Sequence, residues 1–335
     1  MSAILQVKDI DKHFDISGSI LDQLHLDGGK VKRKKTVVKA VNNVTLEVQP
    51  GETLSVVGES GCGKSTLART VMGLYAPNKG EILYRGERID NLSSKEMLPY
   101  RTKMQMVFQD PYASLNPRMT VRQILEEPVR FHNPTLSRAE VRDKVASVML
   151  KVGVDPVWAT NYPHEFSGGQ RQRISIARAL VVNPEFIAAD EPIAALDVSI
   201  QAQILNLLMD AQQERGLTYL FISHDLSVVE HISTRVLVMY LGCVCELATA
   251  SELFSNPQHP YTQALLSAIP KLGGNAGGHV KLSGDVPTPI NLPSGCVFHG
   301  RCPHADKRCM QEIPAQRTLD NGTVVACHAV EEGRI

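Results

Sequence analysis

The stretch Gly58-Glu59-Ser60-Gly61-Cys62-Gly63-Lys64-Ser65-Thr66 decides how this sequence is interpreted, because it follows the phosphate-binding pattern G-x-x-x-x-G-K-[S/T]. Residues 53–57 before it are mostly apolar and β-prone, and residues 66–73 after it have a helical pattern. This order of strand, loop and helix is the one in which the pattern binds phosphate. The alternative, a glycine-rich turn without a ligand, is disfavoured by these flanking segments.

The chemistry of the loop indicates a polyphosphate ligand. Glycines let successive backbone N–H groups converge on an anion, and the following helix adds the positive end of its dipole. Lys64 adds a mobile cation for the outer phosphates. Ser65 has the hydroxyl expected to bind Mg²⁺, whereas Thr66 is expected to be an ordinary first-turn residue. Cys62 is a small residue that fits the loop, and its alkylation should obstruct the ligand.

The composition predicts a globular cytoplasmic protein. Its 335 residues suggest about two domains, and 43% hydrophobic residues allow a sizeable core. Lysine plus arginine and aspartate plus glutamate both number 35, so no global basic field favours nucleic acid. Residues 1–14 lack the apolar region of a secretory signal, and the apolar run 236–245 is too short to span a bilayer. We therefore expect any membrane role to depend on other chains.

Strand-like and helix-like segments alternate along the chain, which is typical of an α/β protein. A polar, helical stretch from 112 to 153 suggests an inserted helical subdomain. Turns are expected at 12–14, 49–51 and 77–80. The expected strands are 4–7, 36–48, 53–57, 81–84, 104–108, 186–191 and 218–223, and the expected helices are 121–129, 138–152 and 167–181.

Two segments allow more than one interpretation. Phe14 either stacks on an adenine ring or packs under the sheet. A basic run before residue 36 forms a solvated hairpin tip or contacts lipid head groups or a partner. The run consists of Lys30, Lys32, Arg33, Lys34 and Lys35.

Polar side chains follow three of the expected strands, where ligands bind in open α/β sheets. Gln109 follows the strand 104–108, and His224 follows the strand 218–223. Asp190 and Glu191 end the apolar run 186–191. Beside a polyphosphate, Asp190 suits Mg²⁺ and Glu191 suits a base that orients water. Each residue alone is a weak signal, because glutamine can cap, histidine is usually structural and two carboxylates can cap a helix.

A second phosphate-binding helix end is expected at Ser167-Gly168-Gly169-Gln170. Ser167 is a suitable N-cap, and the two glycines expose N–H groups. One nucleotide rarely needs two such helix ends in one chain. The second is therefore either structural or serves a nucleotide held by another subunit.

The order of these motifs identifies a family, because the chain resembles the nucleotide-binding subunits of ABC transporters over about residues 1–250. The resemblance implies ATP and Mg²⁺ as cofactors. It implies Glu191, His224 and Gln109 as catalytic residues, and Ser65, Gln109 and Asp190 as Mg²⁺ ligands. The nucleotide site then comprises Phe14, Gly58, Glu59, Ser60, Gly61, Cys62, Gly63, Lys64, Ser65, Thr66, Gln109, Ser167, Gly168, Gly169, Gln170, Asp197 and His224.

The same resemblance implies an α/β fold with a P-loop NTPase (RecA-like) core, an antiparallel β subdomain, an inserted helical subdomain at about 112–182 and a small Cys-rich C-terminal module. The expected domains are 1–250 and 251–335. The resemblance identifies residues 167–170 as the family signature, and the helix that they begin is the signature helix. Each ATP is expected between the phosphate loop of one subunit and the signature helix of another. The chain departs from the family at Ile193 and Ala194, where hydroxyl residues are usual, so fewer hydrogen bonds across the dimer are expected there. Asp197 keeps its place.

The last third is similar to the dipeptide and oligopeptide permease group of importers. The similarity is carried by residues 256–266 (NPQHPYTQALL), by the insertion before Thr36 and by residues 109–117 (QDPYASLNP). It implies an ATPase that powers peptide import as a peripheral protein at the cytoplasmic face of the cell (inner) membrane. The implied partners are a paralogous ATP-binding subunit, two transmembrane permease subunits and an external peptide-binding protein. Residues 112–117 would lie near the surface that receives a helix of the membrane subunit.

Four of the seven cysteines are spaced C-x5-C-x6-C-x17-C near the C-terminus: Cys296, Cys302, Cys309 and Cys327. Disulfides are disfavoured in the cytoplasm, so a metal site is the natural alternative. The spacing matches neither common zinc pairs nor ferredoxin runs, which leaves an iron–sulfur cluster, zinc and free thiols open. A histidine could replace a ligand, from among His299, His304 and His328. Resemblance to importer subunits with a Cys-rich C-terminal module implies a [4Fe–4S] cluster.

Two other functions share parts of this pattern. A soluble ABC-family ATPase acting on nucleic acid or ribosomes would have the same motifs, but the neutral charge and the importer-like tail favour transport. A small-molecule kinase has no use for the signature helix. The identity of the cargo, and whether the partner ATPase is identical or a paralogue, depend on chains other than this one.

Overall fold

The computed structural model describes residues 2–18, 24–27, 30–33, 35–194, 196–269, 284 and 287–335. The described residues form two compact units, each assembled from separate stretches of sequence. Unit 1 consists of Val48–Ser55 and Leu92–Ser223, and unit 2 consists of Ser2–Glu47, Val56–Asn91 and His224–Ile335. The domain boundary expected at residue 250 stays a prediction.

Unit 1 is built on short, buried, parallel strands. Strand β9 (Phe186–Asp190) pairs in parallel with both β8 (Met104–Val107) and β10 (Thr218–Ile222). The first residues of β5 (Thr53–Val57) adjoin β10, where Tyr219 donates its N–H to the carbonyl of Glu52 at 2.8 Å. All residues of β9 and β10 are buried, which explains their continuous apolar sequence. Because the strands are parallel, their carboxyl ends lie at one edge of the sheet.

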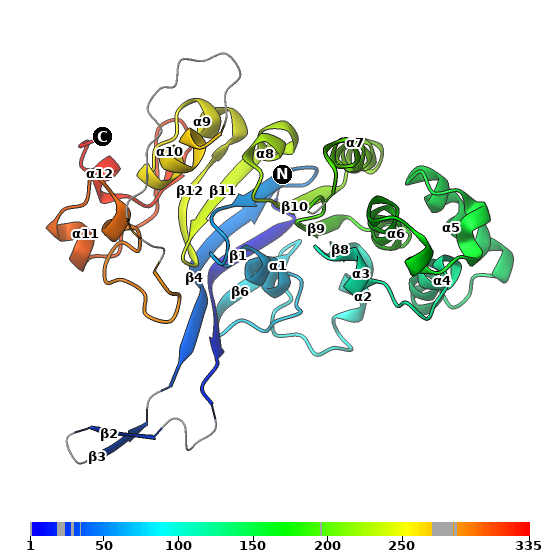
Figure 1. Ribbon diagram of the computed structural model, residues 1–335, viewed down its shortest axis with the longest axis horizontal. Helices are drawn as coiled ribbons and strands as arrows, with labels where there is room; N and C mark the ends of the chain where they lie inside the picture. Colours follow the sequence, from blue (N-terminus) through cyan, green and yellow to red (C-terminus); the bar gives the residue numbers. More distant parts are fainter. Residues whose placement is uncertain are drawn as a thin grey trace. The chain divides into compact units, whose positions relative to one another are not determined.

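Helices make up most of the rest of unit 1, and α4, α5 and α6 lie together as a group (green in Figure 1). Each of these three begins with a capping box, in which the N-cap hydroxyl and a Glu or Gln three residues later exchange hydrogen bonds. The bounds are α2 (Leu98–Lys103), α3 (Pro111–Ser114), α4 (Val121–His132), α5 (Arg138–Lys151), α6 (Gly168–Leu180) and α7 (Val198–Arg215), with 3₁₀ turns η1 (Pro156–Thr160) and η2 (Pro163–Glu165).

Unit 2 contains a sheet with the strand order β4-β1-β6-β7. Its strands are β1 (Leu5–Asp15), β4 (Val37–Val48), β6 (Lys79–Tyr84) and β7 (Glu87–Arg88). Between β1 and β4 in sequence, β2 (Leu24–Asp27) and β3 (Lys30–Arg33) pair as an antiparallel hairpin. The basic run was expected at such a hairpin, although Lys34 lies outside the described residues.

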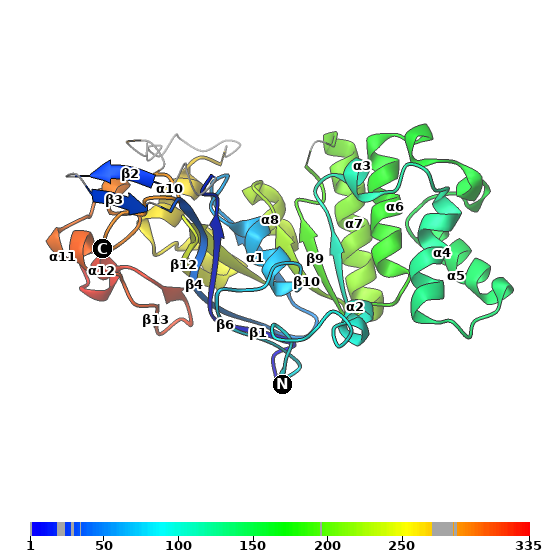
Figure 2. The same cartoon turned by 90° about the horizontal axis from the view of Figure 1, so that it is seen from below.

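A second set of strands in unit 2 has the order β13-β14-β12-β11. Because β14 pairs with β12, the cysteine-bearing C-terminal residues are part of unit 2, and the structure does not set them apart as a compact module of their own (Figure 2). The strands are β11 (Arg235–Tyr240), β12 (Cys243–Thr249), β13 (Arg317–Thr318) and β14 (Val324–Val325). The helices are α1 (Lys64–Val71), α8 (Leu226–Ile232), α9 (Ala250–Ser255), α10 (Pro260–Ser267), α11 (Lys307–Gln311) and α12 (His328–Glu331), with the 3₁₀ turn η3 (His299–Arg301).

Three aromatic side chains form the centre of the C-terminal packing in unit 2. The rings of Tyr240, Tyr261 and Phe298 lie 4.8 to 5.3 Å apart between centroids, and each is at most 1% exposed. Aromatic pairs at this spacing add to the stability that comes from area burial. They join β11 and α10 to the residues that precede η3.

The expected strands and helices agree with the structure except at a few boundaries. Residues 12–14 are not a turn, because β1 continues through them to Asp15 after a register shift between Lys8 and Asp11. Lys79 and Gly80 belong to β6 instead of a turn. Helix α1 begins at Lys64, two residues earlier than residue 66. At the start of β6, pairing of Lys79 with Asp11 of β1 extends the strand into the expected turn.

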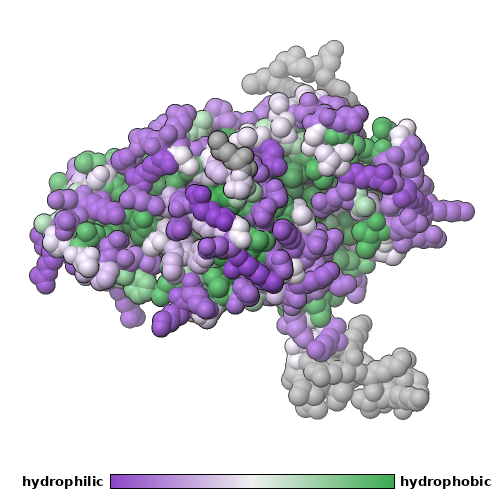
Figure 3. Space-filling model, turned by 180° about the vertical axis from the view of Figure 1, so that it is seen from behind, coloured by the Kyte–Doolittle hydropathy of each residue, from purple (hydrophilic) through white to green (hydrophobic). Residues whose placement is uncertain are grey.

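The surface view of Figure 3 shows one face on which hydrophilic residues predominate and hydrophobic residues appear as separate spots. Among the described residues, every helix is too short or too polar to cross a membrane.

Burial of His259 predicts a pH-dependent stability. Its side chain is 2% exposed, its Nδ1 accepts the N–H of Tyr261, and burial lowers the pKa of His259 to about 4. The histidine of the unfolded chain takes up a proton near pH 6.5, so acidification favours unfolding, by about 2 kcal/mol at pH 5.

We therefore expect His259→Asn, which keeps a capping oxygen but cannot titrate, to be destabilised at pH 7 and to approach wild type at pH 5. Urea unfolding at both pH values measures this difference. Parallel pH dependence in the two proteins would contradict it.

Candidate functional site

The phosphate loop in unit 2 has a backbone that only glycine allows at two positions. Gly58 and Gly63 have φ angles of 148° and 103°. A Cβ atom on Gly58 would lie 2.1 Å from the carbonyl oxygen of Met239, and one on Gly63 would lie 2.0 Å from that of Ala40. Neither backbone atom can move away easily. The glycines of the motif are therefore required by the shape of the loop and by the strands behind it.

Lys64, the first residue of α1, reaches back over the loop. Its Nζ donates to the carbonyl oxygens of Gly58 at 2.8 Å and Glu59 at 3.0 Å, and Lys64 is 6% exposed. The loop thus holds its cation over the space enclosed by its own backbone. Burial raises the pKa of the Cys62 thiol, so this thiol is a poor nucleophile at neutral pH.

Ser65 and Thr66 lie in the first turn of α1, directly after the N-cap Gly63. The N–H groups of such a turn attract anions, and Ser65 is the residue whose hydroxyl was expected to bind Mg²⁺. The structure therefore puts the predicted metal-binding hydroxyl at the same helix end as Lys64.

In unit 1, the structure brings together two predicted site residues that are far apart in sequence. Asp190 is the last residue of β9 and is fully buried. Glu191 follows it with a φ of 46°, and its N–H donates to the carbonyl of Ile222 at 3.0 Å. Gln109, just after β8, donates from Nε2 to Oε2 of Glu191 at 2.8 Å. Left-handed backbone at a non-glycine residue costs about 1 kcal/mol or more, which marks Glu191 as a constrained position.

The signature segment, also in unit 1, begins α6 as predicted. Ser167 is the N-cap, its Oγ accepts the N–H of Gln170 at 3.3 Å, and the Gln170 side chain accepts the N–H of Ser167 at 2.9 Å. A Cβ atom on Gly169 would lie 2.6 Å from Cγ2 of Ile200, at the start of α7. Gly169 therefore permits the close approach of α6 and α7.

Two more predicted residues lie at exposed helix ends. Asp197 is the N-cap of α7, where its carboxylate makes no capping bond. His224 follows β10 and precedes Asp225, whose side chain caps α8. Asp197 belongs to unit 1, whereas His224 and the phosphate loop belong to unit 2. That both sets act on one nucleotide stays a prediction.

Phe14, the predicted adenine contact, is half-buried near the end of β1. The ring centroids of Tyr75 and Phe14 lie 5.3 Å apart in an edge-on arrangement, and Nζ of Lys12 lies 4.8 Å from the Phe14 centroid. Neither of the two expectations for Phe14 is tested by this packing.

All seven cysteines lie in the described residues and are free thiols. Burial raises the pKa of Cys296 to about 12, with added contributions from the charges of Cys327, Cys309 and Cys302. Cys296 thus lies close enough to the other three C-terminal thiols for their charges to act on it. Nevertheless, no group of three or more His, Cys, Asp or Glu residues in the described part of the chain is arranged to hold a metal ion. The expected iron–sulfur or zinc site is therefore without structural support.

Sequence reasoning missed two residues that contact the phosphate loop. Oη of Tyr261 accepts the N–H of Glu59 at 2.8 Å, and Nη1 of Arg301 contacts Oε2 of Glu59 at 2.8 Å. No local pattern connects positions 202 and 242 residues apart. The only signal was that a loop expected to bind an anion contains a carboxylate, which needs a nearby cation.

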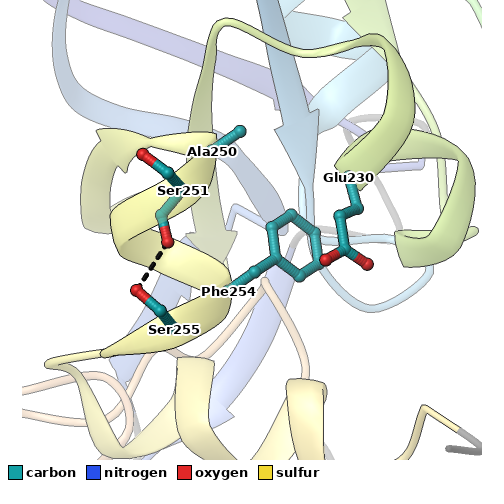
Figure 4. Close-up of a pocket in the computed structure, with 5 residues that line it drawn as sticks. All are labelled: Glu230, Ala250, Ser251, Phe254 and Ser255. Atoms are coloured by element: carbon teal, nitrogen blue, oxygen red, sulfur yellow. Dashed lines mark hydrogen bonds between the residues drawn. The ribbon is translucent and has the colours of Figure 1, made fainter.

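A separate hollow of about 360 Å³ lies between α8 and α9 and is shown in Figure 4. The Phe254 ring lies beside the carboxylate of Glu230, and Oγ of Ser255 donates to the carbonyl of Ser251 at 2.6 Å. With one carboxylate and hydroxyls bonded along their own helix, this hollow offers no set of groups for catalysis.

Comparisons with known proteins agree with the phosphate loop and the other predicted motifs described above. The family model "ABC transporter" matches residues 41–194, and "Oligopeptide/dipeptide transporter, C-terminal region" matches residues 245–309. A solved structure, the dimeric post-hydrolysis state of the ATP-binding cassette MJ0796 bound to ADP and Pi, has a TM-score of 0.62 at 29% identity and covers 73% of this chain and 98% of its own. The chain thus has the α/β fold of an ABC ATPase cassette.

Relatives cover nearly the whole length. The oligopeptide transport ATP-binding protein AppF of Bacillus subtilis (strain 168) is 52% identical over 97% of each chain. The dipeptide transport ATP-binding protein DppF of Escherichia coli (strain K12) is 47% identical over 98% of this chain and 95% of its own. This chain belongs to the family of ABC transporter ATP-binding proteins.

Proposed function

We propose that this chain is the ATP-hydrolysing subunit of an ABC importer for oligopeptides or dipeptides. The observation that carries the proposal is that one chain has both a correctly formed phosphate loop and a match to the oligopeptide/dipeptide transporter C-terminal region over residues 245–309. The proposal does not choose between oligopeptides and dipeptides as cargo, because relatives named for the two kinds of transport match at similar identity, 52% and 47%. A nucleic-acid ATPase is disfavoured by the same relatives.

In the proposed reaction, the N–H groups of the loop and the Lys64 cation bind the phosphates of ATP. The Mg²⁺ ion would be held by Ser65, Asp190 and Gln109, whose hydroxyl, carboxylate and amide oxygens are the hard ligands it prefers. When bound, Mg²⁺ neutralises charge that develops on the phosphates. Gln109 uses its amide nitrogen to contact Glu191, so its amide oxygen is the atom available for the metal ion.

Glu191 is the proposed base that orients the attacking water. The hydrogen bond from Gln109 holds its carboxylate, and the left-handed backbone turns this residue away from the direction of β9. His224 is the proposed contact to the terminal phosphate. Together these groups position and polarise water, which is the main task of a protein in phosphoryl transfer.

We further propose that the signature helix of a second, paralogous subunit completes the nucleotide-binding site. The cap of α6 uses the N–H of Gln170, which leaves the preceding Gly168 and Gly169 as the residues whose N–H groups begin the helix. These residues and Asp197 are at most half-buried in unit 1. The related cassette MJ0796 has been solved as a dimer.

The proposed partners are two membrane permease subunits and an external peptide-binding protein, with the chain bound peripherally at the cytoplasmic face of the inner membrane. Expression of a tagged chain in its own host, followed by gentle solubilisation, should copurify hydrophobic subunits and an ATPase activity that depends on them. Deletion of the chain should abolish uptake of a labelled peptide. Normal uptake in the deletion strain would overturn the proposed function.

Glu191→Gln should bind ATP normally but hydrolyse it about 100-fold or more slowly, the usual effect of losing a general base. The amide is the same size and can still contact Gln109, so nucleotide affinity is expected to stay near wild type. Initial rates of phosphate release and the affinity for a fluorescent ATP analogue measure the two effects. Glu214→Gln, which removes an exposed carboxylate paired with Lys151 in the same unit, is the control.

The C-terminal cysteines are proposed to take up a [4Fe–4S] cluster, as the resemblance implies, with zinc and free thiols as the alternatives. The proposal rests on that resemblance and on the proximity of the thiols, since the charges of Cys327, Cys309 and Cys302 raise the pKa of Cys296 and a bound metal would instead favour the thiolate. No step of ATP hydrolysis depends on this group.

Anaerobically purified chain should contain iron and acid-labile sulfide and absorb visible light. Cys302→Ser should lose the absorbance, whereas Cys243→Ser, in β12, should keep it. Colourless protein with stoichiometric zinc would identify the zinc alternative, and protein without either metal would identify free thiols.

A further inference from the structure

One residue of the phosphate loop, Glu59, is held on three sides. Its carboxylate accepts two hydrogen bonds from Nη1 of Arg301, at 3.1 Å to Oε1 and 2.8 Å to Oε2. Its N–H donates to Oη of Tyr261 at 2.8 Å, and its carbonyl accepts from Nζ of Lys64 at 3.0 Å. Two residues of the C-terminal part of the chain therefore contact the same loop residue that holds the loop lysine.

Arg301 is anchored before it reaches the loop. Its side chain is 9% exposed, and Nη1 also lies 3.3 Å from Oη of Tyr240. Its backbone N–H donates to the carbonyl of Phe298, whose ring packs against Tyr240 and Tyr261. The aromatic cluster thus positions both Arg301 and Tyr261. An ion pair that is mostly buried and anchored in this way is worth more than one on the surface.

A carboxylate in this loop opposes the binding of a polyphosphate. Glu59 lies between Gly58 and Lys64 in the sequence, and its side chain is 24% exposed. A carboxylate and a phosphate carry like charges and repel each other, and partial burial strengthens the effect. Arg301 supplies the opposite charge. The ion pair therefore offsets the repulsion between the Glu59 carboxylate and a bound phosphate.

We propose that Arg301 is a positioning residue for ATP binding: it neutralises Glu59 and holds the phosphate loop in the shape that receives the triphosphate. This inference rests on the proposed function, because it concerns the affinity of the loop for ATP. It assigns to the C-terminal part of the chain a direct part in nucleotide binding. If the pair were purely structural, the double variant would bind ATP as weakly as the variant that lacks only the arginine.

The test compares Arg301→Ala, Arg301→Lys, Glu59→Gln and the double variant Arg301→Ala/Glu59→Gln. We expect Arg301→Ala to weaken binding of a fluorescent ATP analogue about tenfold, which corresponds to about 1.4 kcal/mol. Glu59→Gln should bind at least as tightly as wild type, because the unpaired cation attracts phosphate. The double variant should recover most of the lost affinity, and Arg301→Lys should lie near wild type.

In ATP hydrolysis, the Arg301→Ala effect should fall on KM and leave kcat within about twofold, since the interaction is made equally in the ground state and the transition state. Raising the salt concentration should reduce the difference between Arg301→Ala and wild type, because the repulsion is screened. A double variant that binds ATP as weakly as Arg301→Ala, or Arg301→Ala that binds like wild type, would overturn the proposal.

The matched control is Arg308→Ala, which removes an arginine that pairs with Glu312, Glu331 and Glu332 in the same C-terminal region. It should leave ATP affinity unchanged, and thermal unfolding of every variant shows whether the fold is retained. Lys64→Ala distinguishes loss of the Arg301 effect from loss of ATP binding by the phosphate loop. If wild type binds ATP and only Lys64→Ala loses it, the proposed function stands and the role of Arg301 is wrong; if wild type binds no ATP, both fail.

Discussion

The main constraint on this structure is the tight turn of the phosphate loop, whose backbone N–H groups have to converge to bind one anion. At Gly58 and Gly63 this is possible only without a Cβ atom, because the carbonyl oxygens of Met239 and Ala40 occupy the space. Met239 belongs to β11 and Ala40 to β4, so strands from two sheets of unit 2 form the wall against which the loop is bent. The phosphate-binding shape is therefore a property of the packed unit, and the short motif supplies only the residues that can adopt it.

The charges around the loop follow from the same constraint. Once the backbone is bent, Lys64 lies over the carbonyls of Gly58 and Glu59, and the Glu59 side chain projects towards the C-terminal residues. A partly buried carboxylate without a cation would be unfavourable in the fold and would repel the ligand. Arg301 meets both requirements, since it pairs with Glu59 and is itself stabilised by Tyr240. The C-terminal region thus contributes to the electrostatics of a loop that lies about 240 residues earlier.

Local sequence patterns predicted the elements well and the long-range contacts poorly. The prediction of a strand at 53–57 was correct, because a fully buried strand has a continuous apolar sequence. The prediction of a helix cap at Ser167 was also correct, because the Ser-x-x-Gln pattern is a direct signature of a capping box. The turn expected at 12–14 was wrong because β1 continues through this polar sequence to Asp15. The contact of Gln109 with Glu191 follows from parallel strands ending at one edge, but the hydrogen bond itself depends on backbone geometry at Glu191. Nothing local indicates that Arg301 reaches Glu59.

The departure at residues 193 and 194 has a physical explanation within unit 1. Ile193 is 4% exposed, so its side chain packs inside the unit, where a hydroxyl would need a partner of its own. The segment is held by its backbone instead, because Nε2 of Gln201 donates to the carbonyls of Ile193 at 3.3 Å and Leu196 at 3.1 Å. Those bonds fix the approach to Asp197, whose exposed carboxylate makes no bond to its own helix. The apolar side chain at residue 193 is therefore buried, and the bonds from Gln201 hold the backbone that leads to Asp197.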